Sequence, residues 1–282
     1  MKKAVIRTLA GVAGLGSLAW LGASAVLAVN QRKYIFNPLK EPEAENPKSA
    51  GHHTRTITLT STDGTRLSGW LLTPETAGPH PAVLYFGGRS EEVSWAVRDA
   101  ARLFPGMLAL VVNYRGYGNS GGEPGEPQMV DDAEMLWHWL TQRPNVDPDR
   151  IAVVGRSLGS GIAVKVAVTH PVAALVLVTP YDSLVAIAKR RFRAMPIGFT
   201  MKHRFESIRV ANRISAPVYV LRSESDDVVP HAHTDQLVAR LRTLVADETV
   251  PNSDHHNIPY LEDAQLRIGQ FLSTHLKVKP HA

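Results

Sequence analysis

The main part of the chain alternates short apolar runs with stretches of helical periodicity. Five nearly continuous apolar runs occur at residues 83–86, 108–112, 151–154, 173–178 and 218–221. Uninterrupted apolar strands are buried on both faces, which is typical of parallel strands covered by helices. Between and after these runs, one-sided apolar patterns predict helices at residues 129–142 and 234–245. The small, apolar residues 158–168 and the leucine-containing residues 260–273 predict two more.

A hairpin is expected ahead of these runs. Residues 54–60 alternate between apolar and polar, and residues 67–72 follow after the turn pair Asp63-Gly64. An antiparallel entry followed by strand–helix alternation predicts an α/β fold with a mostly parallel, doubly wound sheet over residues 52–282. In such sheets the chemistry lies at the carboxyl ends of the strands.

The N-terminal region has a different character. Residues 9–29 are 21 residues without charge, which would span about 31 Å as a helix, close to the thickness of a bilayer core. Lys2, Lys3 and Arg7 precede them. This pattern predicts a membrane anchor within residues 1–30 and a domain on the non-cytoplasmic side, periplasmic in a bacterium.

A cleaved signal peptide is the alternative, because Ala23-Ser24-Ala25 fits a cleavage site and cleavage would secrete the domain. The run is longer than the ~7–15 residues of a usual signal peptide, which favours the anchor. The polar, proline-containing stretch within residues 31–51 is expected to be a tether or a strap along the domain surface.

The composition of the chain excludes several kinds of chemistry. With 44% hydrophobic and 20% charged residues the chain is globular, and with no Cys it has no disulfide and no thiolate chemistry. A net charge of +5 does not indicate nucleic acid, and no glycine-rich phosphate motif indicates a nucleotide cofactor. The pairs His52-His53 and His231/His233 have no carboxylate or Cys partner at ligand spacing, so we expect them to be exposed and expect no metal there.

The sharpest motif follows the apolar run at 151–154. Gly155-Arg156-Ser157-Leu158-Gly159 is a G-x-S-x-G sequence between a buried strand and a helix of small residues. Such a turn lifts the serine hydroxyl clear of the sheet and turns the next backbone N–H toward a developing oxyanion. Ser157 is therefore the candidate nucleophile and the Leu158 N–H a candidate oxyanion donor.

A serine nucleophile needs a base and an orienting acid, in the chain order Ser, Asp, His. Asp226 lies in the loop after residues 218–221, and His256 lies in the loop after the strand-like residues 248–251. Asp227 and His255 are adjacent alternatives, and the D-x-x-V-P spacing favours Asp226.

The second oxyanion donor is expected in the loop after residues 83–86. That loop begins Gly87-Gly88-Arg89, so the Arg89 N–H is the first candidate and the Gly88 N–H the second. In the segment 113–122, Arg115 and Tyr117 are near the predicted site, and we expect Arg115 to hold this loop by hydrogen bonds rather than to contact substrate.

The segments YFGGRS, NYRGYGNSGG, GRSLGSG, TPYDSL, SDDVVP and HHNIP together resemble the α/β-hydrolase superfamily. With QRKYIFNP after the apolar run, they most resemble a branch of N-terminally membrane-anchored serine hydrolases that includes eukaryotic protein depalmitoylases and uncharacterised bacterial proteins. The resemblance covers about residues 30–275. It implies Ser157 as nucleophile, Asp226 as acid and His256 as base. Many relatives have His-Gly in place of Gly87-Gly88, and a small residue in place of His255.

The expected function is a membrane-anchored serine hydrolase that cleaves acyl esters or thioesters without a cofactor. A serine peptidase or amidase with the same triad, and a non-enzymatic membrane-tethered binding module, are the alternatives. A small cap is expected at about residues 184–214. Within it, residues 189–213 carry eight basic residues and one acid, Glu206, which predicts contact with anionic lipid headgroups.

Overall fold

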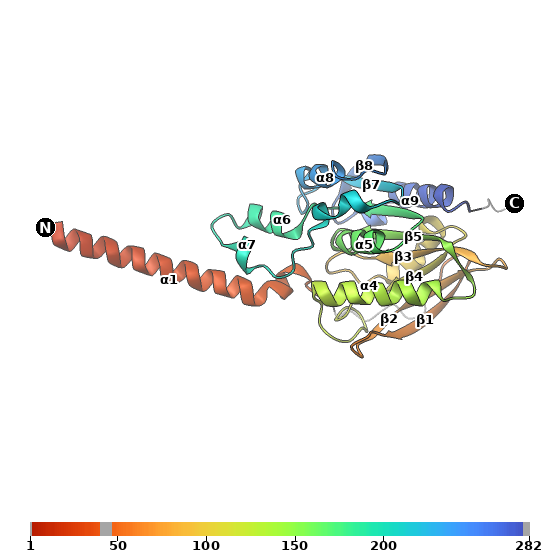
Figure 1. Ribbon diagram of the computed structural model, residues 1–282, viewed down its shortest axis with the longest axis horizontal. Coiled ribbons are helices and arrows are strands. Elements are labelled where there is room, and N and C mark those ends of the chain that lie inside the picture. Colours follow the sequence, from red (N-terminus) through yellow and green to blue (C-terminus); the bar gives the residue numbers. More distant parts are fainter. Residues whose placement is uncertain (1, 40–46, 279–282) are drawn as a thin grey trace.

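The computed structural model describes residues 2–39 and 47–278, with side chains described from residue 19 onward. In this part of the chain, eight strands form one sheet in the order β1-β2-β4-β3-β5-β6-β7-β8 (Figure 1). Strand β2 is antiparallel to both of its neighbours, and all other pairs are parallel. The strands are β1 (His52–Thr60), β2 (Arg66–Pro74), β3 (His80–Phe86), β4 (Leu108–Val112), β5 (Val146–Arg156), β6 (Ala174–Val178), β7 (Val218–Ser225) and β8 (Leu244–Asp254).

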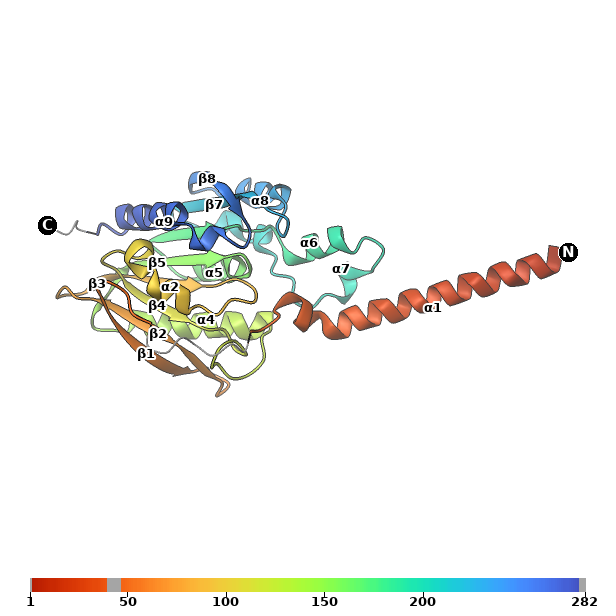
Figure 2. The ribbon, with the colours of Figure 1, turned by 180° about the vertical axis from the view of Figure 1, so that it is seen from behind.

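Helices cover both faces of the sheet, as the continuous apolar strands predict (Figures 1 and 2). On β3, Leu84 and Phe86 pack toward α4 (Glu126–Thr141) and α5 (Leu158–Thr169). Val83 and Tyr85 pack on the opposite face with α2 (Ser94–Arg98), α3 (Ala100–Leu103) and α9 (Glu262–His275). Both clusters are buried, so the sheet is the central layer of a three-layer domain.

The predicted α/β class, the entry hairpin and the five parallel strands are confirmed, as are the helices at α4, α5 and α9. The helix predicted at 234–245 is wrong in its second half. Helix α8 (His231–Val238) ends early, and Leu244 begins β8, where it pairs with Val218. Leu237 and Leu241 are buried, as the apolar pattern predicts. The chain after Val238, however, leaves the helix and then forms the edge strand β8.

Helix α1 (Lys2–Ile35) is a single long helix that projects away from the domain (Figures 1 and 2). Within the described residues, no helix meets the length and apolarity needed to cross a membrane. The predicted span at 9–29 begins in the part of α1 whose side chains lie outside the described residues. Beyond it, Leu21, Val26 and Val29 are exposed on α1.

The end of α1 and the residues that follow it are docked on the domain, so the first part of the predicted region 31–51 is a strap and not a free tether. Residues 31–35 are helical, and residues 40–46 of the tether lie outside the described residues. Phe36, which follows the helix, is fully buried and packs edge-on against His203 and Phe205. The segment after α1 is therefore part of the folded domain up to at least this residue.

The predicted cap is small. It contains α6 (Leu184–Arg191), α7 (Ile197–Thr200) and the short 3-10 helices η1 (Ser207–Arg209) and η2 (Ala211–Arg213). A third 3-10 helix, η3 (Ile258–Tyr260), precedes α9. Helices α6 and α7 lie beside α1 and away from the sheet (Figure 1). Trp20 of α1 donates its indole N–H to the Ala194 carbonyl at 2.5 Å, which ties α1 to the cap.

Candidate active site

Ser157 lies in the sharp turn between β5 and α5. Its backbone has φ 48° and ψ −116°, a conformation that costs a non-glycine residue about 1–3 kcal/mol. Its N–H donates to the Val178 carbonyl at 2.9 Å, and its carbonyl accepts the Ser160 hydroxyl at 2.6 Å. These bonds hold the strained turn in the geometry expected of a nucleophile.

The two motif glycines are required by close packing. A Cβ at Gly155 would lie 2.5 Å from the Ala163 side chain, and a Cβ at Gly159 would lie 2.5 Å from the Gly87 carbonyl oxygen. Both distances are far below normal contact, so α5 can approach β3 and β5 this closely only with glycine at these positions.

A histidine and an aspartate complete a relay behind the serine. The Ser157 hydroxyl lies 2.8 Å from His255 Nε2, and His255 Nδ1 lies 2.9 Å from Asp226 Oδ2. An ionised carboxylate only accepts hydrogen bonds, so Nδ1 carries the proton and Nε2 accepts from the serine. Ser157 and His255 are buried, and so is the carboxyl side chain of Asp226.

The predicted base is corrected by this geometry: His255, and not His256, lies between Ser157 and Asp226. At the end of β8 burial alternates, so Ser253 and His255 are buried while Asp254 and His256 are exposed. Asp254 accepts the His256 N–H at 2.7 Å and thereby fixes the turn. His256 remains at the rim, where it lines the same pocket as the serine.

The predicted acid, Asp226, is brought into the relay, and its neighbour Asp227 is exposed. Burial acts to raise the pKa of Asp226, but hydrogen bonds from His255, the Val229 N–H and the Ser223 hydroxyl outweigh it and hold the pKa below its usual value. The carboxylate is therefore ionised at neutral pH, as an orienting acid must be.

The loop after β3 is organised by a carboxylate that the sequence analysis missed. Glu91 accepts the Gly88 N–H at 2.6 Å, the Trp95 indole at 3.0 Å and the Tyr85 hydroxyl at 2.9 Å. Because the Gly88 N–H already donates to Glu91, it is not available to an oxyanion, and the prediction of Gly88 as a donor is wrong. Arg89 and Leu158 both line the pocket beside Ser157, and Leu158 is the first residue of α5, where a helix N–H has no partner within the helix.

Arg156, the variable residue of the motif, neutralises this buried acid. Its Nη1 lies 2.5 Å from Glu91 Oε2, and its Nη2 donates to the His255 carbonyl at 2.7 Å. Burial acts to lower the pKa of Arg156, but the charge of Glu91 outweighs it and the pKa is raised. The sequence gives no local signal of this pair, because its partners are 65 positions apart.

The segment after α1 supports the same loop. Asn37 donates its side-chain amide to the Ser90 hydroxyl at 2.7 Å, and this hydroxyl donates to the Asn37 carbonyl at 3.0 Å. Tyr117 is fully buried and donates its hydroxyl to the Phe36 carbonyl. Tyr117 thus holds the segment after α1 and does not face the pocket.

Arg115 behaves as predicted for a loop residue. It makes a two-pronged contact with the Asp132 carboxylate at 2.6 and 2.7 Å and reaches Asp63 at 2.8 Å. These partners lie on α4 and on the β1–β2 turn, so Arg115 braces the loop from behind.

Of the histidines expected to be exposed, His53 is exposed, but His52 and His233 are buried and His231 is half-buried. His52 Nε2 lies 3.0 Å from a backbone carbonyl, and His233 Nδ1 lies 2.9 Å from Asp182 Oδ1. Both buried rings therefore have structural partners.

The serine opens into a pocket of about 350 Å³. Ser157, His255 and the loop after β3 form its polar wall, and its remaining wall is largely apolar. The apolar lining comes from α1, the cap and the loops after β7 and β8: Ile35, Leu184, Ile187, Val228, Val229 and Tyr260. The site is thus suited to a substrate that combines a polar reacting group with an apolar portion.

Comparison with known proteins identifies the superfamily of the chain. A family model described as serine aminopeptidase, S33, a hydrolase family, matches residues 77–195. An uncharacterized protein of Mycobacterium tuberculosis strain H37Rv is 33% identical over 260 residues, which cover 91% of each chain. The chain belongs to the α/β-hydrolase superfamily.

Other α/β-hydrolases resemble the chain more distantly. A lysophosphatidylserine lipase of Danio rerio is 27% identical over 277 residues, covering 82% of this chain and 70% of the lipase. An esterase of Pyrococcus furiosus superposes with a TM-score of 0.67 at 18% identity, covering 86% of this chain and 98% of the esterase. This superposition shows that the chain and the esterase share a fold.

Proposed function

We propose that this α/β-hydrolase is a serine hydrolase that cleaves carboxylic esters or thioesters through an acyl-enzyme on Ser157. The observation that carries the proposal is the relay itself: Ser157 Oγ, His255 Nε2, His255 Nδ1 and Asp226 Oδ2 at successive hydrogen-bond distances of 2.8 and 2.9 Å. A serine in such a relay is activated by the adjacent base.

In the proposed reaction, Ser157 Oγ attacks the acyl carbonyl and gives its proton to His255, while Asp226 stabilises the imidazolium. The backbone N–H groups of Leu158 and Arg89 stabilise the oxyanion. His255 then protonates the departing alcohol or thiol. A water molecule, deprotonated by His255, attacks the acyl-enzyme, releases the acid and restores the serine.

The pocket favours esters and thioesters over the amino-terminal peptide bond that the description of the family model suggests. A carboxylate free of other partners would pair with the ammonium group of an aminopeptidase substrate. Glu91 is the acid among the described lining residues, and it is paired with Arg156 and bonded to the Gly88 N–H. The names of the esterase and lipase relatives point the same way.

An apolar acyl group is the substrate portion that the pocket accommodates best. A second, apolar hollow of about 70 Å³ lies between α1 and the cap, lined among others by Leu27, Ala188 and Phe192. Ile35 lines both this hollow and the catalytic pocket. The apolar hollow beside α1 therefore adjoins the catalytic pocket at Ile35.

We further propose that the protein acts at a membrane, anchored by the apolar run 9–29, with the domain on the non-cytoplasmic side. The described part of α1 supports this with exposed apolar side chains. The basic segment 189–213 lies beside α1 and exposes Phe199 almost completely, at 95%. Basic side chains near an anionic surface gain about 1 kcal/mol each, so this segment would orient the pocket toward lipid-borne acyl groups.

The decisive experiment is an activity screen of the purified full chain with acyl esters and acyl thioesters of graded chain length, alongside aminoacyl amides. The proposal predicts turnover of esters or thioesters that is lost in Ser157→Ala. Turnover of aminoacyl amides alone would favour the peptidase function, and no turnover with no labelling by a fluorophosphonate would favour a binding module.

A further inference from the structure

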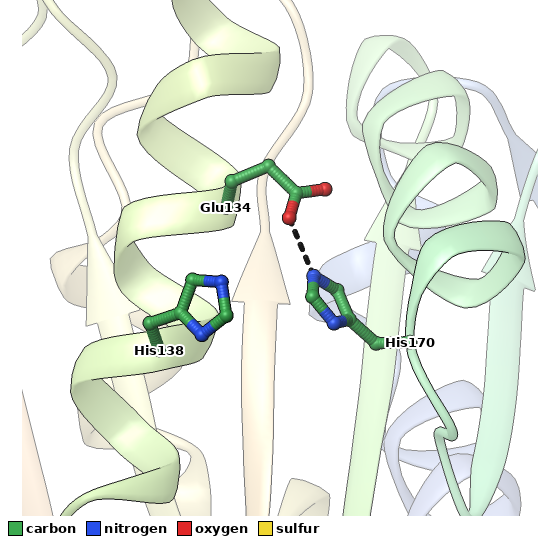
Figure 3. Close-up of side chains that lie close together, drawn as sticks. All are labelled: Glu134, His138 and His170. Carbon is green, nitrogen blue, oxygen red and sulfur yellow. Dashed lines mark hydrogen bonds and ion pairs between the residues drawn. The ribbon is translucent and has the colours of Figure 1, made fainter.

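A second cluster of metal-ligating side chains lies on the helical face of the domain. Glu134 and His138 are one helical turn apart on α4, and His170 caps the C-terminal end of α5. Figure 3 shows the two α4 side chains and His170 pointing toward one another across the gap between the helices. One ligand atom from each residue lies within 4.8 Å of the other two.

Two of the three ligands already contact each other. His170 Nε2 lies 2.5 Å from Glu134 Oε2, and the side chains are 11% and 30% exposed. The His170 ring stacks on buried Trp137 at 4.9 Å, almost parallel, and meets His138 edge-on at 5.3 Å. His138 is the exposed member of the cluster.

The donor set matches a transition metal. Two imidazole nitrogens and one carboxylate oxygen are a common ligand set for Zn²⁺, with a fourth position left for water. Ligand distances of about 2.0–2.2 Å in a tetrahedral site place the ligand atoms about 3.4 Å apart. His170 Nε2 and Glu134 Oε2 are 2.5 Å apart and would have to separate by about 1 Å, whereas the other ligand atoms, which lie within 4.8 Å, would have to approach by up to about 1.4 Å.

We propose that Glu134, His138 and His170 form a binding site for Zn²⁺ or a similar divalent transition metal that fastens α4 to α5. The site is separate from the hydrolytic chemistry. Ser157 precedes α5 and His170 follows it, and the 12 residues of this helix span about 18 Å. The ion would replace the bond between His170 and Glu134 and stabilise the packing of the two helices.

The test is zinc titration of the chelator-treated full chain, freed of any histidine tag, by isothermal titration calorimetry and by thermal unfolding. We expect one Zn²⁺ bound through this site and a Tm that rises with zinc, because an ion that binds only the folded state stabilises it. Glu134→Gln and His138→Ala should each weaken binding by at least roughly tenfold and reduce the rise in Tm at a given zinc concentration. His53→Ala, at an exposed histidine outside the cluster, is the matched control and should bind like wild type.

Cobalt gives an independent readout that a purely structural role of these residues would not produce. Co²⁺ should give visible absorption bands that zinc displaces in the wild type and that His138→Ala lacks. The absence of zinc binding, or zinc binding equally strong in Glu134→Gln, His138→Ala and wild type, would overturn the proposal. Hydrolytic activity of His138→Ala should remain unchanged whatever the metal content.

Discussion

Arg156 Nη2 donates to the backbone carbonyl of His255 at 2.7 Å, so the residue before the nucleophile holds the loop that carries the base. The other end of the same guanidinium is paired with Glu91, which fixes the Gly88 N–H in the loop after β3. One buried side chain therefore connects the three loops that converge on Ser157. This explains how loops from distant parts of the chain keep fixed positions relative to one another.

Breaking the buried pair should be costly. Arg156→Met and Glu91→Gln should each lower the free energy of unfolding by about 3–5 kcal/mol, because each leaves an uncompensated buried charge. Both should also reduce kcat, since the loops lose their common brace. Chemical denaturation measures the first effect and steady-state kinetics the second.

Two comparisons control for this result. Arg209→Met removes a surface pair with Glu206, in which the arginine side chain is 69% exposed, and should cost less than about 1 kcal/mol. The double variant at positions 91 and 156 should lose less stability than the sum of the single variants. If the single variants at 91 and 156 were as mild as Arg209→Met, the brace would have no energetic role.

The two adjacent histidines should differ sharply. His255→Ala should reduce kcat by roughly 10³-fold or more, because it removes the base that contacts Ser157. His256→Ala should keep activity within about tenfold, because His256 lies at the pocket rim. Kinetics of the two purified variants on one soluble ester decide between them, and an inactive His256→Ala with an active His255→Ala would contradict the relay.

The adjacent aspartates allow the same comparison. Asp226→Asn should reduce kcat strongly, because an amide does not hold His255 in the required tautomer. Asp227→Asn is the matched control, since Asp227 is exposed and should leave activity near wild type. Equal loss in both variants would indicate a disturbed loop and not a specific orienting acid.

The low pKa of Asp226 predicts a pH-dependent contribution to stability. Since its folded pKa lies below the value of about 3.9 in an unfolded chain, the ionised carboxylate stabilises the fold fully above that value. The contribution is lost as the pH falls through the folded pKa. The difference in unfolding free energy between wild type and Asp226→Asn should therefore narrow from pH 5 to pH 3. A difference that stays constant or widens over this range would contradict the assigned direction.

Contact with anionic lipid can be tested on the full chain in vesicles. Replacing phosphatidylcholine partly by phosphatidylserine should speed hydrolysis of a membrane-embedded acyl ester, and added salt should reduce the gain. The triple variant Arg190→Glu, Arg191→Glu, Arg193→Glu should remove the gain without changing hydrolysis of a soluble ester. The matched control is the triple variant Arg55→Glu, Arg66→Glu, Arg240→Glu, which changes three exposed arginines elsewhere. If both triple variants behave alike, segment 189–213 has no specific role at the membrane.

The sheet was predictable because its strands are buried on both faces and so read as continuous apolar runs. The error at 234–245 arose because Leu237, Leu241 and Leu244 fit a helical period, while the strand that Leu244 begins depends on pairing with Val218. Such pairing is set by distant residues and leaves no local signal. An edge strand with polar outer positions lacks the apolar run that marked the inner strands.

The site was predictable to the level of its loops and not to the level of its atoms. The G-x-S-x-G motif placed Ser157 because the turn is encoded locally by its glycines. The choice between His255 and His256 depends on side-chain alternation at the end of β8 and on the Asp254 turn, which family spacing does not specify. The pairing of Glu91 with Arg156 appears only when β3 and β5 lie side by side.

The most direct test of the central claim is covalent capture of Ser157. Treating the purified full chain with a fluorophosphonate probe and mapping the adduct by peptide mass spectrometry should place one label on Ser157. The label should be absent in Ser157→Ala, which should keep the Tm of the wild type and lose roughly 10³-fold or more in turnover. Labelling at another residue, or Ser157→Ala protein that still hydrolyses acyl esters at the wild-type rate, would contradict the account.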